Sequence, residues 1–224
     1  MQKPSSYGPI CLMYEGKRVS HILYERALED SADYAEQHMT NALVFFDESK
    51  ILMYDYAISK ITFDGLIGEF GVYQGRVVNY LATQMPDKTI HGFDSFNGLP
   101  EDWKGWENPK GSFNLNGIPP QVETNVELVG GYFDQSLPLW VKDHEEPFSL
   151  LVIDSDLYSS ACAILDILGT KQIVSGTLIL FDEYFGHIGW RNNEFKAWQE
   201  FVKKHNIQYE YLAINHLQTL VRVI

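Results

Sequence analysis

Residues 148–156 read FSLLVIDSD, an apolar run that ends in two carboxylates. Its four consecutive apolar residues, Leu150 to Ile153, indicate a strand that is buried on both faces. Such strands are typical of parallel sheets that carry helices on both sides. This stretch therefore predicts an α/β protein with acidic side chains at the carboxyl end of one of its strands.

Outward from this run, short apolar segments alternate with periodic, helix-like ones from residue 64 onward, which favours an open α/β sheet. The predicted strands are Leu66–Phe70, Thr89–Phe93, Val126–Val129, Phe148–Ile153, Thr177–Phe181, Gln208–Ile214 and Leu217–Val223. The predicted helices are Tyr73–Gln84, Leu157–Leu168 and Asn193–His205. The last two strands lie too close for a helical crossover, so we expect an antiparallel hairpin at one edge. The prediction is a Rossmann-like, seven-stranded, mostly parallel sheet with helices on both faces.

The N-terminal residues 1–63 are mixed in character and show no mark of an independent domain. Apolar periodicity predicts helices at Val19–Leu28 and Asp47–Lys60, with Asp47 as the N-cap. We interpret this part as a helical cap on a domain that spans residues 64–224.

A long segment, residues 95–120, is rich in glycine and proline and contains Trp103, Trp106 and Phe113. A loop of this length inside a compact domain is usually functional or disordered. The aromatic side chains favour a lid that folds over a ligand.

The composition excludes several classes of partner. The 224 residues carry 17 Lys and Arg against 30 Asp and Glu, a formal charge of −13. Nucleic acids and anionic membranes select clustered basic side chains, so neither is an expected partner. The sequence shows no signal peptide and no apolar run of about 18 residues. Because Cys162 lies in an apolar helical stretch far from Cys11, we expect reduced thiols and a cytoplasmic protein.

Two features at the first strand ends indicate an adenosine-type ligand. Gly71 and Gly75 follow the first strand and let the backbone pass close to a ligand before a helix begins. Their spacing is not G-x-G-x-x-G, so the dinucleotide fingerprint is absent. Asp94 ends the second strand, 19 residues beyond Gly75. A carboxylate there can accept hydrogen bonds from a ribose diol, although an N-cap or Asx-turn is the alternative.

Two acidic motifs follow later strands, Asp154-Ser155-Asp156 after residues 148–153 and Asp182-Glu183 after residues 177–181. Neighbouring strands would bring these acids to one rim of the sheet, where they repel one another unless a cation lies between them. A ligand set made of oxygen atoms suits Mg²⁺, Ca²⁺ or Mn²⁺. The alternative is that they are helix N-caps and loop acids.

Five ordered motifs carry a family resemblance. They are EFGVYQG (69–75), HGFDSFNGLP (91–100), GYFD (131–134), IDSDLYSS (153–160) and FDEY (181–184). Together they resemble class I S-adenosylmethionine-dependent methyltransferases of the macrocin O-methyltransferase-like group. Enzymes of that group methylate sugar hydroxyls of natural products with a divalent cation. The resemblance runs from about residue 64 to residue 204.

The resemblance implies a set of site residues. Glu69, Gly71 and Tyr73 would line the methionine end of the cofactor S-adenosylmethionine, and Gly75 would lie at the start of the following helix. Asp94 would bind the ribose hydroxyls, with Ser95 beside them. Tyr132, Phe133 and Ser155 would lie around the adenine. Asp154, Asp182 and Glu183 would hold the metal ion, Mg²⁺ or another divalent cation. The family usually has a second Asp where this chain has Glu183, and the longer side chain would shift the ion or withdraw from it.

The expected reaction is an in-line methyl transfer to a hydroxyl of a small molecule. Asp154 is the candidate for the residue that receives the acceptor proton. His187 is a second candidate, against the plainer interpretation of a solvated loop histidine. Asp156 either supports the metal or caps the following helix.

Three other functions fit part of this pattern. A metal-dependent glycosyltransferase would explain Asp-x-Asp, an NAD-dependent oxidoreductase would explain Asp94, and a non-catalytic protein could keep the fold. The aromatic residues of the long loop indicate an acceptor with a flat or apolar portion. A homodimer is the commonest expectation for such a protein.

Overall fold

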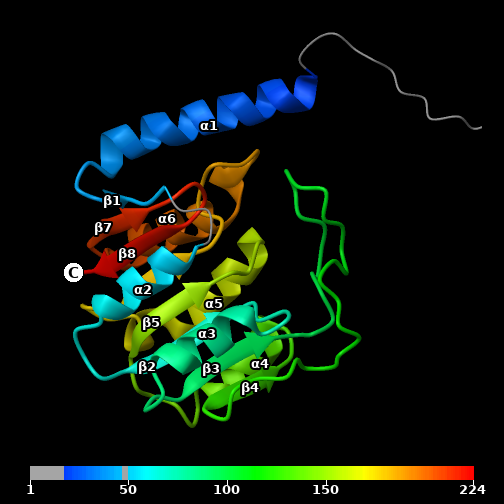
Figure 1. Ribbon diagram of the computed structural model, residues 1–224, viewed down its shortest axis with the longest axis vertical. Coiled ribbons are helices and arrows are strands. Elements are labelled where there is room, and N and C mark those ends of the chain that lie inside the picture. The colour runs from blue at the N-terminus through cyan, green and yellow to red at the C-terminus, as the bar shows by residue number, and fades with distance from the viewer. Residues whose placement is uncertain (1–17, 47–49) are drawn as a thin grey trace, which may run out of the picture.

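The computed structural model describes residues 18–46 and 50–224, and its centre is a single mixed sheet (Figure 1). The eight strands lie in the order β1-β7-β8-β6-β5-β2-β3-β4. They are β1 (Leu43–Val44), β2 (Leu66–Phe70), β3 (Ile90–Asp94), β4 (Val126–Gly130), β5 (Phe148–Ile153), β6 (Leu178–Phe181), β7 (Tyr209–Ile214) and β8 (Thr219–Val223). The helices are α1 (Val19–His38), α2 (Ile51–Ser59), α3 (Arg76–Gln84), α4 (Phe133–Trp140), α5 (Tyr158–Gln172) and α6 (Glu194–His205), with a 3₁₀ turn at Trp190–Asn192.

The predicted fold class is confirmed, and the predicted strand count of seven is wrong. The seven expected strands are present, and β8 runs antiparallel to both β7 and β6. The additional strand, β1, has only two residues and pairs in parallel with β7 at the sheet edge. Two residues are too few to show an alternating pattern. Helix α4 was also missed, because it is short and contains Pro138.

The sheet has a separate apolar core on each face, and β5 contributes to both. Leu150 and Val152 pack in a cluster with side chains of α2 and α3. Leu151 and Ile153 point the other way, into a cluster with α4, α5 and α6. This two-sided burial is the physical reason for the unbroken apolar run in the sequence.

Several helix boundaries differ from the prediction. Helix α1 continues to His38, ten residues beyond the expected end. Helix α2 begins at Ile51 after Lys50, whose φ of 63° is left-handed; the expected cap, Asp47, lies outside the described residues. Helix α3 begins at Arg76 because the three residues before it form a turn that includes Gly75 with a φ of 78°.

Gly71 fixes the distance between the ends of β2 and β5. Its φ is +106°, and a Cβ atom added there would lie 1.7 Å from the carbonyl oxygen of Asp154. Only glycine fits this position. The Gly71 N–H donates to the Phe93 carbonyl oxygen at 2.9 Å, and the Asp154 N–H donates to that of Phe70 at 2.9 Å. The ends of β2, β3 and β5 are therefore held together.

The N-terminal part lies over one end of the sheet, where α1 crosses the molecule beside β1 and β7 (Figure 1). Ser31 is the buried residue of α1, and its hydroxyl accepts a hydrogen bond from the Gly186 N–H at 2.9 Å. None of the helices in the described part of the chain combines the length and apolarity that a membrane crossing needs.

Candidate active site

A cavity of about 710 Å³ opens at the carboxyl ends of β2, β3, β5 and β6. It lies where β2 has β3 on one side and β5 on the other, the point at which ligands bind in open α/β sheets. Ten of the predicted site residues line it: Gly71, Tyr73, Asp94, Ser95, Tyr132, Phe133, Asp154, Ser155, Asp182 and Glu183. Glu69 and Gly75 are not among the lining residues.

Backbone N–H groups hold the carboxylate of Asp94 in place. One oxygen, Oδ2, accepts hydrogen bonds from the N–H groups of Val72 at 2.9 Å and Tyr73 at 2.7 Å. The other, Oδ1, accepts from the Phe96 N–H at 2.7 Å. Asp94 thus fastens the glycine turn to the end of β3 while it lines the cavity.

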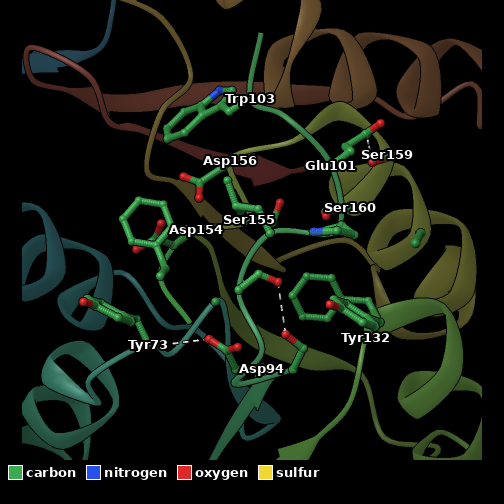
Figure 2. Close-up of a pocket in the computed structure, with 18 of the residues that line it drawn as sticks. Tyr73, Asp94, Glu101, Trp103, Tyr132, Asp154, Ser155, Asp156, Ser159 and Ser160 are labelled. Carbon is green, nitrogen blue, oxygen red and sulfur yellow. Dashed lines mark hydrogen bonds between the residues drawn. The ribbon is translucent and has the colours of Figure 1, made fainter. Parts of the chain in front are cut away.

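Figure 2 shows Tyr132 across the cavity from Asp154, with Asp94 between them at the lower edge of the view. Tyr132 precedes α4 directly, so its position is set by the start of that helix. The hydroxyl of Ser95 donates to the Gly98 carbonyl oxygen at 3.3 Å and accepts from the Asn97 N–H at 3.0 Å. These contacts order the chain where the long loop leaves β3.

The predicted metal ligands lie close together on the opposite side of the cavity. Asp154, Asp182 and Glu183 each offer an oxygen atom, and these atoms lie within 4.8 Å of one another. Asp182 also has two side-chain partners. Its Oδ1 accepts from Gln218 Nε2 at 2.6 Å and its Oδ2 from Lys50 Nζ at 2.5 Å. The Lys50 ammonium is 3.9 Å from Glu183 Oε1, so it lies within the acidic cluster.

Burial and mutual repulsion dominate the electrostatics of this cluster. Burial, together with the charge of Asp182, raises the pKa of both Asp154 and Glu183 well above the ordinary carboxyl range. Burial alone would lower the pKa of Lys50, but the charges of Asp182 and Glu183 raise it above its usual value. The ammonium is therefore a counter-charge to acids that repel one another.

The cluster fits a divalent cation. Its donor atoms are all carboxylate oxygens, the ligands that Mg²⁺ prefers. Within the described part of the chain, Glu183 Oε2 is buried and has no hydrogen-bond partner, which leaves it available to a cation. Because Lys50 already bonds to Asp182 Oδ2, an ion that uses this oxygen has to displace the ammonium.

Glu194, which was not predicted, joins the ends of β5 and β6. Its Oε1 accepts from the Ser155 N–H at 2.9 Å and its Oε2 from the Glu183 N–H at 3.4 Å. Burial raises the pKa of Glu194 to about 7. A glutamate in the first turn of an amphipathic helix gives no such signal in the sequence. Lys50 and Gln218 were also missed, because only tertiary packing brings them to Asp182.

For two polar residues near the cavity, His187 and Asp156, the structure excludes one of the two alternative roles expected from the sequence. His187 is 2% exposed, so it is not a solvated loop residue. Its Nδ1 accepts from Trp106 Nε1 at 3.1 Å, and burial lowers its pKa. Asp156 does not cap α5, because the N-cap position belongs to Leu157 and carries no side-chain hydrogen bond. Asp156 lines the cavity instead, with a left-handed φ of 62°.

The long loop contributes aromatic residues to the cavity wall. Trp103 is buried against Leu99 and Leu157, so it anchors the loop to the start of α5. Trp106 is 39% exposed and Phe113 is 40% exposed, and the centroid of the Phe113 ring lies 5.5 Å from that of the Tyr73 ring. Figure 1 shows this segment as a green arm along one side of the sheet.

Comparison with known families agrees with this geometry. A model described as macrocin-O-methyltransferase (TylF) matches residues 112–222, from the long loop to the last strand. Together the fold, the cavity and this match define an O-methyltransferase of the S-adenosylmethionine-dependent class. This part of the chain, slightly less than half of its length, matches the macrocin-O-methyltransferase family.

Solved structures show the same fold. A calicheamicin methyltransferase, CalS11, is 19% identical with a TM-score of 0.64, over 98% of this chain and 99% of that one. Its apo structure, described as a TDP-rhamnose 3'-O-methyltransferase, is 18% identical with a TM-score of 0.58, over 92% and 96%. The O-methyltransferase NovP is 19% identical with a TM-score of 0.58, over 77% and 76%. Among curated proteins, none matches the sequence.

Proposed function

We propose that this protein transfers a methyl group from S-adenosylmethionine to a hydroxyl of a sugar or a sugar-bearing natural product, with the help of a divalent cation. The observation that carries this proposal is the cavity itself. It combines a glycine turn and Asp94 on one side with three clustered carboxylates on the other. The family match and the sugar methyltransferase among the similar structures support the same class of acceptor.

The first side of the cavity would hold the methyl donor. Gly71 and Tyr73 would contact its methionine part, and Asp94 has acceptor capacity left for a ribose hydroxyl because a carboxylate offers about four lone-pair sites. Tyr132, Phe133, Ser95 and Ser155 would border the adenosine. Glu69 is buried behind the turn and Gly75 precedes α3, so we assign both to shaping the turn.

The second side would hold the cation, with Asp154, Asp182 and Glu183 as ligands and Mg²⁺ as the ion that their oxygen atoms favour. When bound, such an ion lowers the pKa of an acceptor hydroxyl and fixes its position. Without an ion, the Lys50 ammonium neutralises part of the cluster.

The chain's own part in the reaction is alignment and proton removal. The C–O bond forms as the C–S bond breaks, the electron pair of that bond goes to sulfur, and the hydroxyl proton passes to a carboxylate. Asp154 is the proposed proton acceptor, and Asp156 faces the same cavity (Figure 2). Holding the reacting atoms in line is worth ~7–11 kcal/mol in well-oriented systems.

The long loop would cover the acceptor. Its exposed rings, Trp106 and Phe113, line the cavity and are suited to stacking on a flat or apolar part of the acceptor.

The expected homodimer stays a prediction.

The test is a screen for release of S-adenosylhomocysteine with nucleotide-linked sugars and glycosylated aromatic compounds as acceptors. Each acceptor is tested with Mg²⁺ and with EDTA, and binding of NAD and UDP-sugars is measured in parallel. The proposal expects acceptor-dependent release that EDTA abolishes and Mg²⁺ restores. Binding of a UDP-sugar or NAD without any binding of S-adenosylmethionine would contradict it.

A further inference from the structure

A second cluster of ligand-type side chains lies outside the cavity, at the edge of the sheet. His91, Glu127 and His144 each offer one ligand atom, and these atoms lie within 4.8 Å of one another. His91 and Glu127 are register partners on β3 and β4, so their side chains leave the sheet on the same face. His144 belongs to the segment between α4 and β5.

The distances within this cluster match those around one metal ion. His91 Nδ1 lies 3.5 Å from Glu127 Oε2. Two ligands on a tetrahedral zinc ion, with bonds of 2.0–2.1 Å, are about 3.4 Å apart. The ring centroids of His91 and His144 are 5.5 Å apart, where two imidazoles on one such ion would be about 5 Å apart.

His91 points a buried, unpartnered nitrogen into this cluster. The residue is 4% exposed, and within the described part of the chain its Nδ1 has no hydrogen-bond partner. Buried polar atoms are normally paired, so an unpaired one calls for an explanation such as an absent ion. An ion could reach the cluster from solvent beside Glu127, because the side chain of Glu127 is 64% exposed.

One ring nitrogen of His144 bonds to a backbone carbonyl oxygen, as is usual for histidines whose other ring nitrogen binds a metal ion. Its Nδ1 lies 2.9 Å from the carbonyl oxygen of Trp140, so Nδ1 carries the proton and Nε2 is left with its lone pair. The ring stacks on that of Trp140 at 4.0 Å. Gln172 Nε2 donates to the backbone oxygen of His144 at 2.9 Å and fixes the segment that carries it.

We propose that His91, Glu127 and His144 form a site for a divalent transition metal ion, with Zn²⁺ as the ion that this ligand set favours and water in the fourth position. Imidazole nitrogens select Zn²⁺ over Mg²⁺, whereas the carboxylates of the cavity select Mg²⁺. The ion would tie the edge strand β4 and the α4–β5 segment to β3. None of these three residues lines the cavity proposed for methyl transfer.

The test is calorimetric titration of ZnCl₂ into the untagged, chelator-treated protein. We expect one Zn²⁺ per chain at this site, and at least about tenfold weaker binding in E127Q and in H144Q. H216Q changes an exposed histidine elsewhere, and D182N weakens the acidic cluster of the cavity, so both should keep the affinity of the wild type. E127Q alters an exposed side chain, and its folding is checked by circular dichroism.

A second readout is the visible absorption of Co²⁺ bound in place of Zn²⁺, which should appear in the wild type and disappear in H144Q. Zinc binding that is unchanged in E127Q and H144Q would overturn the proposal, as would no zinc binding at all. Loss of binding in D182N alone would also overturn it, because the ion would then lie in the cavity.

Discussion

Two carboxylates at strand ends, Asp94 after β3 and Asp182 after β6, are held in opposite ways. Asp94 accepts three backbone N–H groups, from residues 2, 21 and 22 positions away. Asp182 bonds to two side chains, Gln218 and Lys50, which are 36 and 132 positions away. The first arrangement is fixed by the backbone of the turn, and the second depends on a lysine that another cation could replace. Under the proposed function, this difference makes the side of the cavity that would bind the methyl donor rigid and the side that would bind the cation and acceptor adjustable.

The largest effect should come from removing the rigidity of the donor side. G71A places a methyl group against the carbonyl oxygen of Asp154 in a backbone conformation that alanine rarely adopts. We expect a loss of about 2–5 kcal/mol in the free energy of unfolding and no measurable binding of S-adenosylhomocysteine. Urea unfolding and calorimetry measure the two quantities.

The matched control is G130A, because a Cβ atom there meets nothing within 4 Å. G130A should leave ligand binding within about twofold of the wild type. If G71A bound S-adenosylhomocysteine as tightly as the wild type, the close approach of β2 and β5 would not be what shapes the site.

The next effect concerns the acceptor side. D182N keeps the shape of the side chain but removes a proposed ligand charge, so methyl transfer should fall by roughly 10²–10³-fold. Binding of S-adenosylhomocysteine should stay near that of the wild type. The assay is product release, with D166N as the control because Asp166 is exposed and pairs with Lys204. Equal activity in D182N and D166N would show that methyl transfer does not depend on a cation bound by Asp182.

A smaller effect is expected from D94N. An amide group in place of one carboxylate oxygen would turn a hydrogen towards the N–H groups of Val72 and Tyr73 or of Phe96. We expect S-adenosylhomocysteine to bind about tenfold more weakly, measured by calorimetry. The control is D143N, in an exposed turn outside the cavity. If D143N lost as much affinity for S-adenosylhomocysteine as D94N, the loss would not be specific to the turn that Asp94 holds.

The smallest effect, and the one with the opposite sign, should come from K50M. Methionine keeps the length of the side chain and removes the ammonium that competes for Asp182 Oδ2. We expect Mg²⁺ to bind about three- to tenfold more tightly, because the charge of the cluster is no longer offset. K60M is the control, since Lys60 lies over the Tyr56 ring. Mg²⁺ binding that weakens in K50M would show that Lys50 supports the ion rather than competing with it.

The contrast between the two carboxylates also explains what the sequence could predict. The buried strands, the antiparallel C-terminal pair and the rim of acids follow from patterns within short segments. Lys50 could not be found this way, because a lysine before an apolar helix is usually solvated. Glu194 was hidden for the same reason, since nothing near it in the sequence indicates that packing turns it towards Ser155. Features encoded in short segments were predictable from the sequence, and contacts between residues far apart in the chain were not.

The most direct measurement is a crystal structure with S-adenosylhomocysteine and Mg²⁺ bound. The account predicts an ion about 2.0–2.1 Å from oxygens of Asp154 and Asp182, with Glu183 turned towards it and the Lys50 ammonium moved away from Asp182. A structure at saturating Mg²⁺ in which Lys50 still bonds to Asp182 and no ion lies among the three acids would contradict the account.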